Sequence, residues 1–134
     1  MQRESPKLTV DAVIIENDSV VLIKRRNYPF EGMWALPGGF VNYGERVEDA
    51  VVREAKEETG LDVRVEKLVG VYSAPDRDPR GHTVGVAFLC KIIGGTLKFG
   101  DDAAEVKKFR ISELPELAFD HRKILANALE FLKG

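Results

Sequence analysis

Three glutamates lie close together near the middle of the chain, in the segment Arg53-Glu-Ala-Lys-Glu-Glu58. Glu54, Glu57 and Glu58 are spaced at i, i+3 and i+4, so on a helix their carboxylates share one side. Three converging oxygen donors are the kind of ligand set that Mg²⁺ selects. Taken alone, the segment is more typical of a solvated acidic helix face, so the surrounding sequence has to decide between the two interpretations.

A helix is expected to carry these glutamates, over residues 45–59. Its apolar face is formed by residues that recur at i, i+3, i+4 and i+8, namely Val47, Ala50, Val51 and Ala55. Gly60 then supplies the helix stop. The apolar face packs on the core in this arrangement, and the carboxylates are expected to point away from it.

Apolar runs rich in β-branched residues predict strands on both sides of this helix. The expected strands cover residues 7–15, 20–25, 63–72, 83–93 and 107–111. The first two form a hairpin, and Gly94-Gly95 is expected to form a tight turn after residues 83–93. Residues 27–43 are rich in Gly and Pro, which is typical of a loop with a short extended piece.

An amphipathic helix is expected at the end of the chain. Asp120 is a good N-cap, and the apolar stripe after it consists of Ile124, Leu125, Ala128, Leu129 and Leu132. Strands, one central helix, more strands and a final helix predict an α/β fold, with a mixed β-sheet sandwiched between helices. We expect one domain over residues 1–134.

Composition excludes several classes of protein. The 20 basic and 22 acidic residues give a net charge of −2, without the basic excess of a nucleic-acid binder. No apolar run approaches the roughly 18 residues that a membrane span requires, and the N-terminus lacks the apolar core of a signal peptide. Cys90 is the single cysteine and is expected to be buried. We therefore expect a cytoplasmic protein that binds neither nucleic acid nor membrane.

The residues around the glutamates read GFVNYGERVEDAVVREAKEETGL, over residues 39–61. This stretch resembles the Nudix box: a glycine, five residues, a glutamate, seven residues, then Arg-Glu-aliphatic-any-Glu-Glu-any-Gly-aliphatic. The matching fixed positions are Gly39, Glu45, Arg53, Glu54, Glu57, Glu58, Gly60 and Leu61. Ala55 stands at the first aliphatic position and is smaller than the usual residue. The flanking strands and the final helix also fit the Nudix fold.

The resemblance implies a metal site. The implied ligands are the carboxylates of Glu54, Glu57 and Glu58 and the backbone carbonyl of Gly38. Arg53 and Glu45 are implied to form an orienting pair behind these ligands. Gly39 lets the loop before the helix approach the metal ions. The implied cofactor is Mg²⁺, for which Mn²⁺ is a substitute.

The expected chemistry follows from charge. A diphosphate is strongly anionic and repels an attacking hydroxide. Mg²⁺ neutralises that charge, lowers the pKa of water and orients in-line attack on one phosphorus. A carboxylate then takes the proton of the water, and this base is either a box glutamate or a carboxylate of a mobile loop. Glu105, just before the strand at residues 107–111, is the loop candidate.

A segment beyond the box bears on the substrate. Pro75 stands where the ADP-ribose pyrophosphatases of the family look to carry a proline. The runs RDPRGH, DDAAEV and LAFDH, which begin at residues 77, 101 and 117, are also similar to that subgroup. The resemblance implies hydrolysis of a nucleoside diphosphate derivative, and in particular of ADP-ribose to AMP and ribose 5-phosphate.

Four arginines are candidates for binding this substrate. Arg77 and Arg80 can bind phosphate or ribose groups in a bidentate manner, or pair with neighbouring aspartates instead. Pro75 stiffens their loop, which reduces the entropy lost on binding. Arg25 and Arg26 end a strand, so their side chains alternate and at most one faces the site.

Aromatic residues and histidines supply further candidates. One of Phe30, Trp34, Phe40 and Tyr43 is a candidate for stacking on adenine, although core packing is the more typical role of each. His82 is a candidate for phosphate binding or proton transfer, although a structural role is the more typical one. His121 follows the N-cap and is expected to be structural.

Alternatives stay open at this point. Other Nudix substrates are oxidised deoxynucleoside triphosphates, dinucleoside polyphosphates and other nucleotide sugars. A non-catalytic nucleotide-sugar sensor is disfavoured, because all box glutamates are present and no residues are left for a second domain. The oligomeric state also stays open; one alternative is a homodimer in which the apolar N-terminal strand pairs across the interface.

Overall fold

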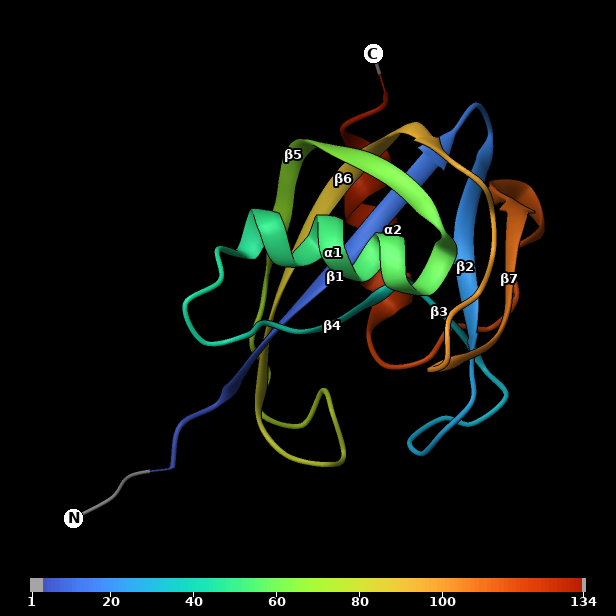
Figure 1. The fold of residues 1–134 in the computed structure, drawn as a ribbon. Coiled ribbons are helices and arrows are strands. Elements are labelled where there is room, and N and C mark those ends of the chain that lie inside the picture. The colour runs from blue at the N-terminus through green and yellow to red at the C-terminus, as the bar shows by residue number, and fades with distance from the viewer. Residues whose placement is uncertain (1–3, 134) are drawn as a thin grey trace.

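In the computed structural model, which describes residues 4–133, a mixed β-sheet lies between two α-helices (Figure 1). The elements are β1 (Lys7–Glu16), β2 (Ser19–Arg25), β3 (Trp34–Ala35), β4 (Gly38–Phe40), α1 (Val47–Thr59), β5 (Leu61–Tyr72), β6 (Thr83–Gly95), β7 (Ala103–Arg110), a 3-10 turn (Ile111–Glu113) and α2 (His121–Glu130). The predicted α/β sandwich is therefore confirmed.

Strand β1 lies in the interior of the sheet. The strand order is β3-β2-β1-β6-β5, while β4 also pairs with β1 and β7 also pairs with β2. β1 is parallel to β6 over residues 7–14 and antiparallel to β4 over residues 9–11. Only its last two residues pair with β2, so the predicted hairpin is correct but short. Both edges of β1 are thus occupied over most of its length by strands of the same chain.

The side chains of β1 alternate between the two faces of the sheet, as the pleat of a strand requires. Those of Val10, Ala12 and Ile14 pack in one core cluster with the apolar face of α1, and Val13 packs in a second cluster with α2. Both clusters are fully buried at their centres. A strand covered on both faces explains why residues 7–15 appear as a nearly continuous apolar run.

The predicted turn at Gly94-Gly95 is wrong. Both glycines lie within β6, where Gly94 pairs with Asp62 and Gly95 pairs with Leu61 of β5. The strand continues because β5 already begins at Leu61, directly after the end of α1. Gly60 ends that helix as predicted, with a φ of 75° that places it in the left-handed region.

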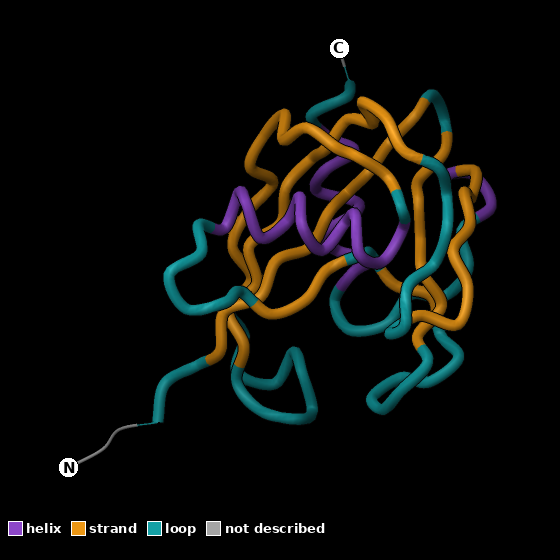
Figure 2. Tube along the Cα trace, viewed as in Figure 1, coloured by secondary structure: helices purple, strands orange, loops and turns teal. Residues whose placement is uncertain are grey.

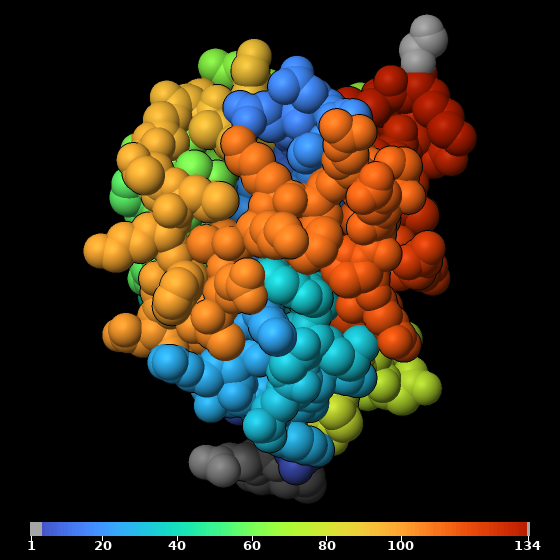
Figure 3. All heavy atoms as spheres, turned by 90° about the vertical axis from the view of Figure 1, so that its right-hand side faces the viewer, coloured from blue at the N-terminus to red at the C-terminus, as the bar shows by residue number. Residues whose placement is uncertain are grey.

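Strand β7 begins earlier than predicted, at Ala103. Its residues pair with β2, and Glu105 lies opposite Lys24. Glu105 is therefore an exposed residue within a strand rather than part of a mobile loop. Figure 3 shows β7 and the segment before it, in orange, covering one side of the molecule beside residues 27–37.

The final helix begins after Asp120, as predicted, but the side chain of Asp120 makes no capping hydrogen bond. It binds Arg77 instead, with Oδ2 and Oδ1 accepting hydrogen bonds of 2.9 and 2.8 Å. The predicted stripe of α2 is buried at Ile124, Leu125 and Ala128, whereas Leu132 is exposed beyond the helix. The loops at residues 26–33 and 73–82 lie at the same end of the sheet (Figure 2).

Candidate active site

Arg53 holds the acidic cluster together. Its Nε and Nη2 donate to the two carboxylate oxygens of Glu45, at 2.8 and 2.9 Å. Nη1 donates to Glu54 at 2.8 Å and to Glu57 at 3.2 Å, and Nη2 also reaches the carbonyl of Phe40 at 3.1 Å. The hydrogen bonds from Arg53 lower the pKa of Glu45 to about 2. The structure thus brings together the two residues predicted to form an orienting pair.

Two of the three central glutamates are buried rather than solvated. Glu58 is only 7% exposed, and the side chain of Glu54 is largely covered. Burial raises the pKa of Glu58 to about 8, and it also raises the pKa of Glu54 despite the hydrogen bond from Arg53. The expectation that all three carboxylates point away from the core is therefore wrong for Glu58. Glu57 alone is exposed, at 56% of its side chain.

The strand before the helix approaches these carboxylates very closely. The amide of Gly38 donates to Oε1 of Glu58 at 3.0 Å. A Cβ atom at Gly39 would lie 2.6 Å from the carboxylate atoms of Glu54. Any residue larger than glycine at position 39 would therefore displace Glu54, which agrees with the close approach predicted for this glycine.

The donor set fits a divalent cation. Burial disfavours the ionised carboxylates of Glu54 and Glu58. A hard cation that binds oxygen ligands would stabilise these ionised carboxylates. Among residues 4–133, however, no three His, Cys, Asp or Glu side chains are close enough together to hold a metal ion as they stand. The predicted convergence of three carboxylates is thus incomplete, because Arg53 binds both Glu54 and Glu57.

A fourth carboxylate near the cluster was missed by sequence reasoning. The negative charge of Asp102 adds to the effect of burial and raises the pKa of both Glu54 and Glu58. Asp102 lies in a turn that Arg26 ties to strand β2, through a hydrogen bond of 3.0 Å to the carbonyl of Asp101. Glu105, the predicted loop candidate, lies within β7 instead, so the turn before β7 carries Asp102 and not the predicted residue.

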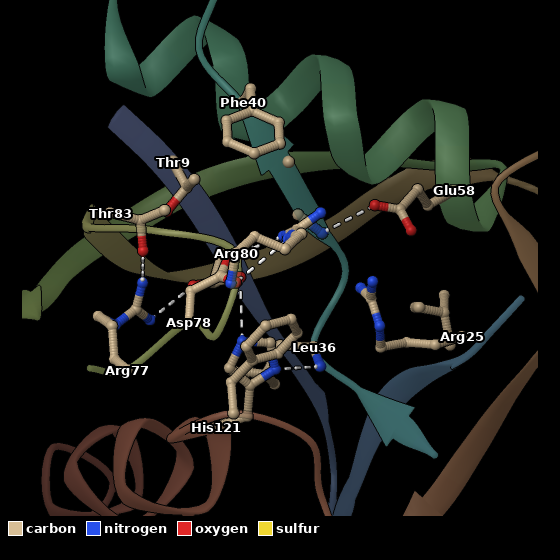
Figure 4. A pocket seen from close by; sticks show the side chains of 15 residues that line it. Thr9, Arg25, Leu36, Phe40, Glu58, Arg77, Asp78, Arg80, Thr83 and His121 are labelled. Atoms are coloured by element: carbon tan, nitrogen blue, oxygen red, sulfur yellow. Dashed lines mark hydrogen bonds and ion pairs between the residues drawn. The ribbon is translucent and has the colours of Figure 1, made fainter. Parts of the chain in front are cut away.

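A cavity adjoins the acidic cluster, between β1, β4 and the loop at residues 77–83 (Figure 4). Arg25, Arg77 and Arg80 line it, together with Glu58. Arg26 does not, so only one of the two strand arginines faces the site, as the alternation predicted. Cations beside an acidic metal site provide the charge that a diphosphate requires.

The three arginines of the cavity differ in how many of their guanidinium donors are already bound within the protein. Arg77 is buried, with its donors bound to Asp120 and to Thr83 Oγ1, the latter at 2.9 Å. Arg80 is partly exposed and pairs with Asp78 at 2.8 Å. Arg25 donates from Nε to the carbonyl of Pro29 at 2.6 Å. Arg80 and Arg25 therefore retain donors for a ligand, whereas Arg77 is held within the protein.

The aromatic candidates separate clearly. Phe30 packs edge-on against Phe119 with ring centroids 4.8 Å apart, and Trp34 packs against Phe109 at 4.7 Å. Tyr43 is fully exposed. Phe40 lines the cavity and lies 5.5 Å from the guanidinium of Arg80. Among the four, Phe40 is thus the one beside the site.

The remaining candidates lie outside the cavity or behind it. Pro75 is exposed in the loop at residues 73–82 and does not line the cavity. His82 is exposed and contacts the carbonyl of Ser73 at 2.9 Å. Cys90 is buried, as predicted, and burial raises its pKa to about 12.

His121 and Asp11 form a buried pair that lines the cavity. Nδ1 of His121 accepts a hydrogen bond of 3.0 Å from the amide of Leu36, so the neutral ring carries its proton on Nε2, which lies 3.4 Å from Asp11 Oδ1. Burial lowers the pKa of His121 and raises that of Asp11. His121 is structural, as predicted. Asp11 lies within an apolar run, where no local pattern marks it.

The chain matches known proteins over nearly its whole length. The family model "NUDIX domain" matches residues 5–128. The ADP-ribose pyrophosphatase of Methanocaldococcus jannaschii is 54% identical, over 96% of this chain and 76% of its own. A MutT/nudix family protein from Enterococcus faecalis has a TM-score of 0.86 at 37% identity, over 98% of this chain and 64% of its own. The NUDIX domain of Shewanella oneidensis NrtR, crystallised with ADP ribose, has a TM-score of 0.85 at 29% identity, over 98% and 91%.

The chain therefore belongs to the Nudix family, as the spacing from Gly39 to Leu61 predicted. It is an enzyme of that family, a hydrolase that acts on the diphosphate of a nucleotide derivative. No helix among residues 4–133 is long and apolar enough to cross a membrane.

Proposed function

We propose that this enzyme hydrolyses ADP-ribose to AMP and ribose 5-phosphate and depends on Mg²⁺. The observation that carries the proposal is the 54% identity, over 96% of the chain, to a protein named ADP-ribose pyrophosphatase. A structural neighbour that binds ADP ribose supports the same ligand. The cavity that the arginines line lies beside the acidic cluster, and this arrangement supports binding of a diphosphate between the arginines and the cluster.

The proposed metal ligands are Glu54, Glu57, Glu58 and the carbonyl of Gly38. Glu57 is exposed and its contact with Arg53 is the longest of the cluster, so it can turn toward a metal at little cost. When bound, Mg²⁺ supplies positive charge to the diphosphate and polarises it. Arg53 keeps Glu54 in place meanwhile, because Glu45 fixes the guanidinium from behind through two hydrogen bonds.

Hydrolysis forms a bond between a water oxygen and one phosphorus and breaks the bond from that phosphorus to the bridging oxygen. The proton of the water passes to a carboxylate. We place this base at Asp102 rather than at Glu105, because Asp102 lies in the exposed turn that Arg26 holds before β7, whereas Glu105 lies in strand β7 opposite Lys24. A box glutamate is the alternative base.

The substrate phosphates are proposed to contact Arg25 and Arg80, which line the cavity and retain free donors. Arg77 stabilises the lining of the cavity through its hydrogen bonds to Asp120 and Thr83. Arg26 acts indirectly, since it holds the turn that carries Asp102. Pro75 stiffens the loop of Arg77 and Arg80 without contacting the substrate.

A substrate panel tests the proposal. ADP-ribose, a dinucleoside polyphosphate, an oxidised deoxynucleoside triphosphate and a second nucleotide sugar are compared by kcat/KM, with Mg²⁺ and with Mn²⁺. We expect ADP-ribose to rank first and to yield AMP and ribose 5-phosphate. A higher rank for another substrate would replace ADP-ribose within the same class of reaction. Tight binding of ADP-ribose without any turnover would indicate a sensor instead.

A further inference from the structure

One buried carboxylate beside the active site has no role in the hydrolysis described above. Asp11 stands in the middle of β1, between Val10 and Ala12, which are completely buried. Asp11 itself is only 7% exposed, and it lines the arginine cavity from the side of the sheet that faces α2. A charged group at this depth is costly unless something binds it.

Within residues 4–133, neither oxygen of Asp11 receives a hydrogen bond. Its two polar neighbours are His121 Nε2 at 3.4 Å and Arg77 Nη2 at 4.0 Å. Among the described residues, every side-chain oxygen or nitrogen that is completely covered has a hydrogen-bond partner. The oxygens of Asp11 have none, so they are not completely covered, and the space that they face is the cavity that Asp11 lines. Buried polar groups without partners are rare in folded proteins, and this one faces space that a ligand can enter.

The neighbours of Asp11 are held by other partners. Arg77 is bound to Asp120 and Thr83, and His121 receives the amide hydrogen of Leu36. Arg77 cannot turn to Asp11 without breaking these bonds, and Nε2 of His121 stays 3.4 Å from Oδ1, beyond the length of an ordinary hydrogen bond. The two groups stabilise the charge of Asp11 from a distance and leave its oxygens free for donors that come from the cavity.

Asp11 is directly adjacent to the acidic cluster. The backbone of Gly38 pairs with Asp11 across the β1–β4 ladder, and a Cβ atom at Gly38 would lie 2.6 Å from Asp11 Oδ1. The amide of the same glycine donates to Glu58 at 3.0 Å. One residue thus separates the free carboxylate from the place where the diphosphate is expected.

We propose that Asp11 accepts hydrogen bonds from the vicinal hydroxyls of a ribose joined to the diphosphate. This inference rests on the proposed function and names the part of the substrate that the cavity floor recognises. Two carboxylate oxygens match two neighbouring hydroxyl donors, which would add direct hydrogen bonds to the longer contacts with His121 and Arg77. The ribose is esterified to the diphosphate through its own 5′-oxygen, so its vicinal hydroxyls lie nearer to the diphosphate than the amino group of adenine does.

Calorimetry with the non-hydrolysable ligand α,β-methylene-ADP-ribose tests this assignment in the presence of Mg²⁺. Its dissociation constant is compared with those of analogues that lack one hydroxyl on either ribose. In the wild-type protein, removal of the hydroxyl from one of the two riboses should weaken binding roughly 10- to 100-fold, because Asp11 is then left buried without a donor. Asp11→Asn should bind all these ligands within about threefold of one another.

Asp76→Asn is the matched control, because Asp76 is an exposed aspartate outside the cavity. It should discriminate between the ligands as the wild type does. Thermal melting checks that Asp11→Asn is folded, and Asp11→Ser replaces it if it is not. Equal binding of all ligands by the wild type would overturn the assignment, as would unchanged discrimination by the folded variant. It would also be overturned if Asp11→Asn instead abolished a preference for adenine over hypoxanthine.

This experiment separates the inference from the proposed function, since calorimetry needs no turnover. A protein that discriminates the riboses through Asp11 but never cleaves ADP-ribose would contradict only the proposed activity. A protein that cleaves ADP-ribose yet ignores the hydroxyls would contradict only the role of Asp11.

Discussion

Arg53 is the residue on which the geometry of the acidic cluster depends. Its guanidinium contacts Glu45, Glu54 and Glu57 at 2.8, 2.8 and 3.2 Å, and it also reaches the carbonyl of Phe40. A planar group with five donors can serve these partners at once, whereas a lysine ammonium cannot. The positions of Glu54 and Glu57 are therefore set by a residue that need not touch the substrate.

Replacement of Arg53 by lysine should lower kcat by roughly 10- to 100-fold, the usual effect of losing an outer partner of metal ligands. The charge is kept, but the paired hydrogen bonds to Glu45 are lost. Steady-state kinetics with ADP-ribose measures the effect. Arg64→Lys is the control, since Arg64 makes only an exposed contact with Glu66. Similar kcat values for both variants would remove Arg53 from the orienting role.

Mutations of Asp102 and Glu105 should have different effects on turnover. Asp102→Asn should reduce kcat by about 100-fold or more, as loss of a general base does, while KM changes little. Glu105→Gln should leave kcat within about twofold, because Glu105 lies in β7, where it pairs opposite Lys24. The reverse order would restore Glu105 as the base. Full activity in both variants would assign the base to a box glutamate.

At the scale of elements, strand β4 and helix α1 build the site together. The helix presents Glu54 and Glu58 on its turns, and the strand passes so close that its glycines leave no room for side chains. β4 is itself fixed against β1 by pairing at residues 9–11. The site is therefore assembled from backbone that the sheet holds rigidly, which suits a metal centre that tolerates little displacement.

Gly39→Ala tests this contact between the elements. The added Cβ would lie 2.6 Å from the carboxylate of Glu54, so Glu54 must move and turnover should fall at least about tenfold. Gly94→Ala is the control, because its Cβ would meet only the side chain of Asp62, at 3.3 Å. Kinetics and thermal melting are measured on both proteins. An active, stable Gly39→Ala variant would show that a Cβ atom at position 39 does not displace the carboxylate of Glu54.

At the scale of the whole molecule, the sheet brings together residues that are far apart in the sequence. Asp11 of β1, Glu58 of α1, Arg77 of a loop and His121 of α2 all line one cavity. The two helices cover opposite faces of the sheet (Figure 1). The cavity is lined by residues of β1 and of its neighbours β4 and β6. Because several charged groups are buried there, we expect the stability of the protein to depend on pH.

Without metal, the free energy of unfolding should fall as pH rises from about 4.5 to about 8. Burial raises the pKa of Glu58 from 4.5 to about 8, so in this interval the folded protein keeps a proton that the unfolded chain releases. One such group contributes a slope of up to about 1.4 kcal/mol per pH unit, and Glu54 adds in the same direction. Urea unfolding in EDTA measures this slope.

Glu58→Gln supplies the comparison for the pH experiment. A glutamine has no proton to release, so most of the slope should disappear in the metal-free variant. Saturating Mg²⁺ should stabilise the wild type most at high pH, where Glu58 is ionised. Equal slopes in the two metal-free proteins would show that Glu58 titrates normally.

Much of the fold follows from local patterns. The apolar face from Val47 to Ala55 and the stop at Gly60 define α1, and the β-branched runs define β1, β2, β5 and β6. The pairing of Gly94 and Gly95 with β5 could not be predicted, because a double glycine is typical of a turn unless a partner strand extends to meet it. The early start of β7 at Ala103 depends in the same way on pairing with β2.

In the candidate site, too, some residues follow from local sequence patterns and others depend on tertiary contacts. Spacing alone locates Glu54, Glu57, Glu58 and their partners, since all lie on one helix or just before it. Burial of Glu58 depends on the passage of β4, and the free carboxylate of Asp11 lies inside an apolar run. Arg77 has the residue type of a phosphate ligand, yet Asp120 binds it from 43 positions away. Such contacts arise only from the tertiary fold.

The central claim is that the acidic cluster hydrolyses ADP-ribose with a bound metal, and turnover by wild type and Glu57→Gln tests it most directly. ADP-ribose is incubated with each protein in Mg²⁺ and in EDTA, and AMP and ribose 5-phosphate are quantified by anion exchange. We predict turnover only for the wild type with Mg²⁺, and at least about a 100-fold loss in Glu57→Gln with an unchanged melting temperature. Metal-independent cleavage, or near-normal cleavage by Glu57→Gln, would contradict the account.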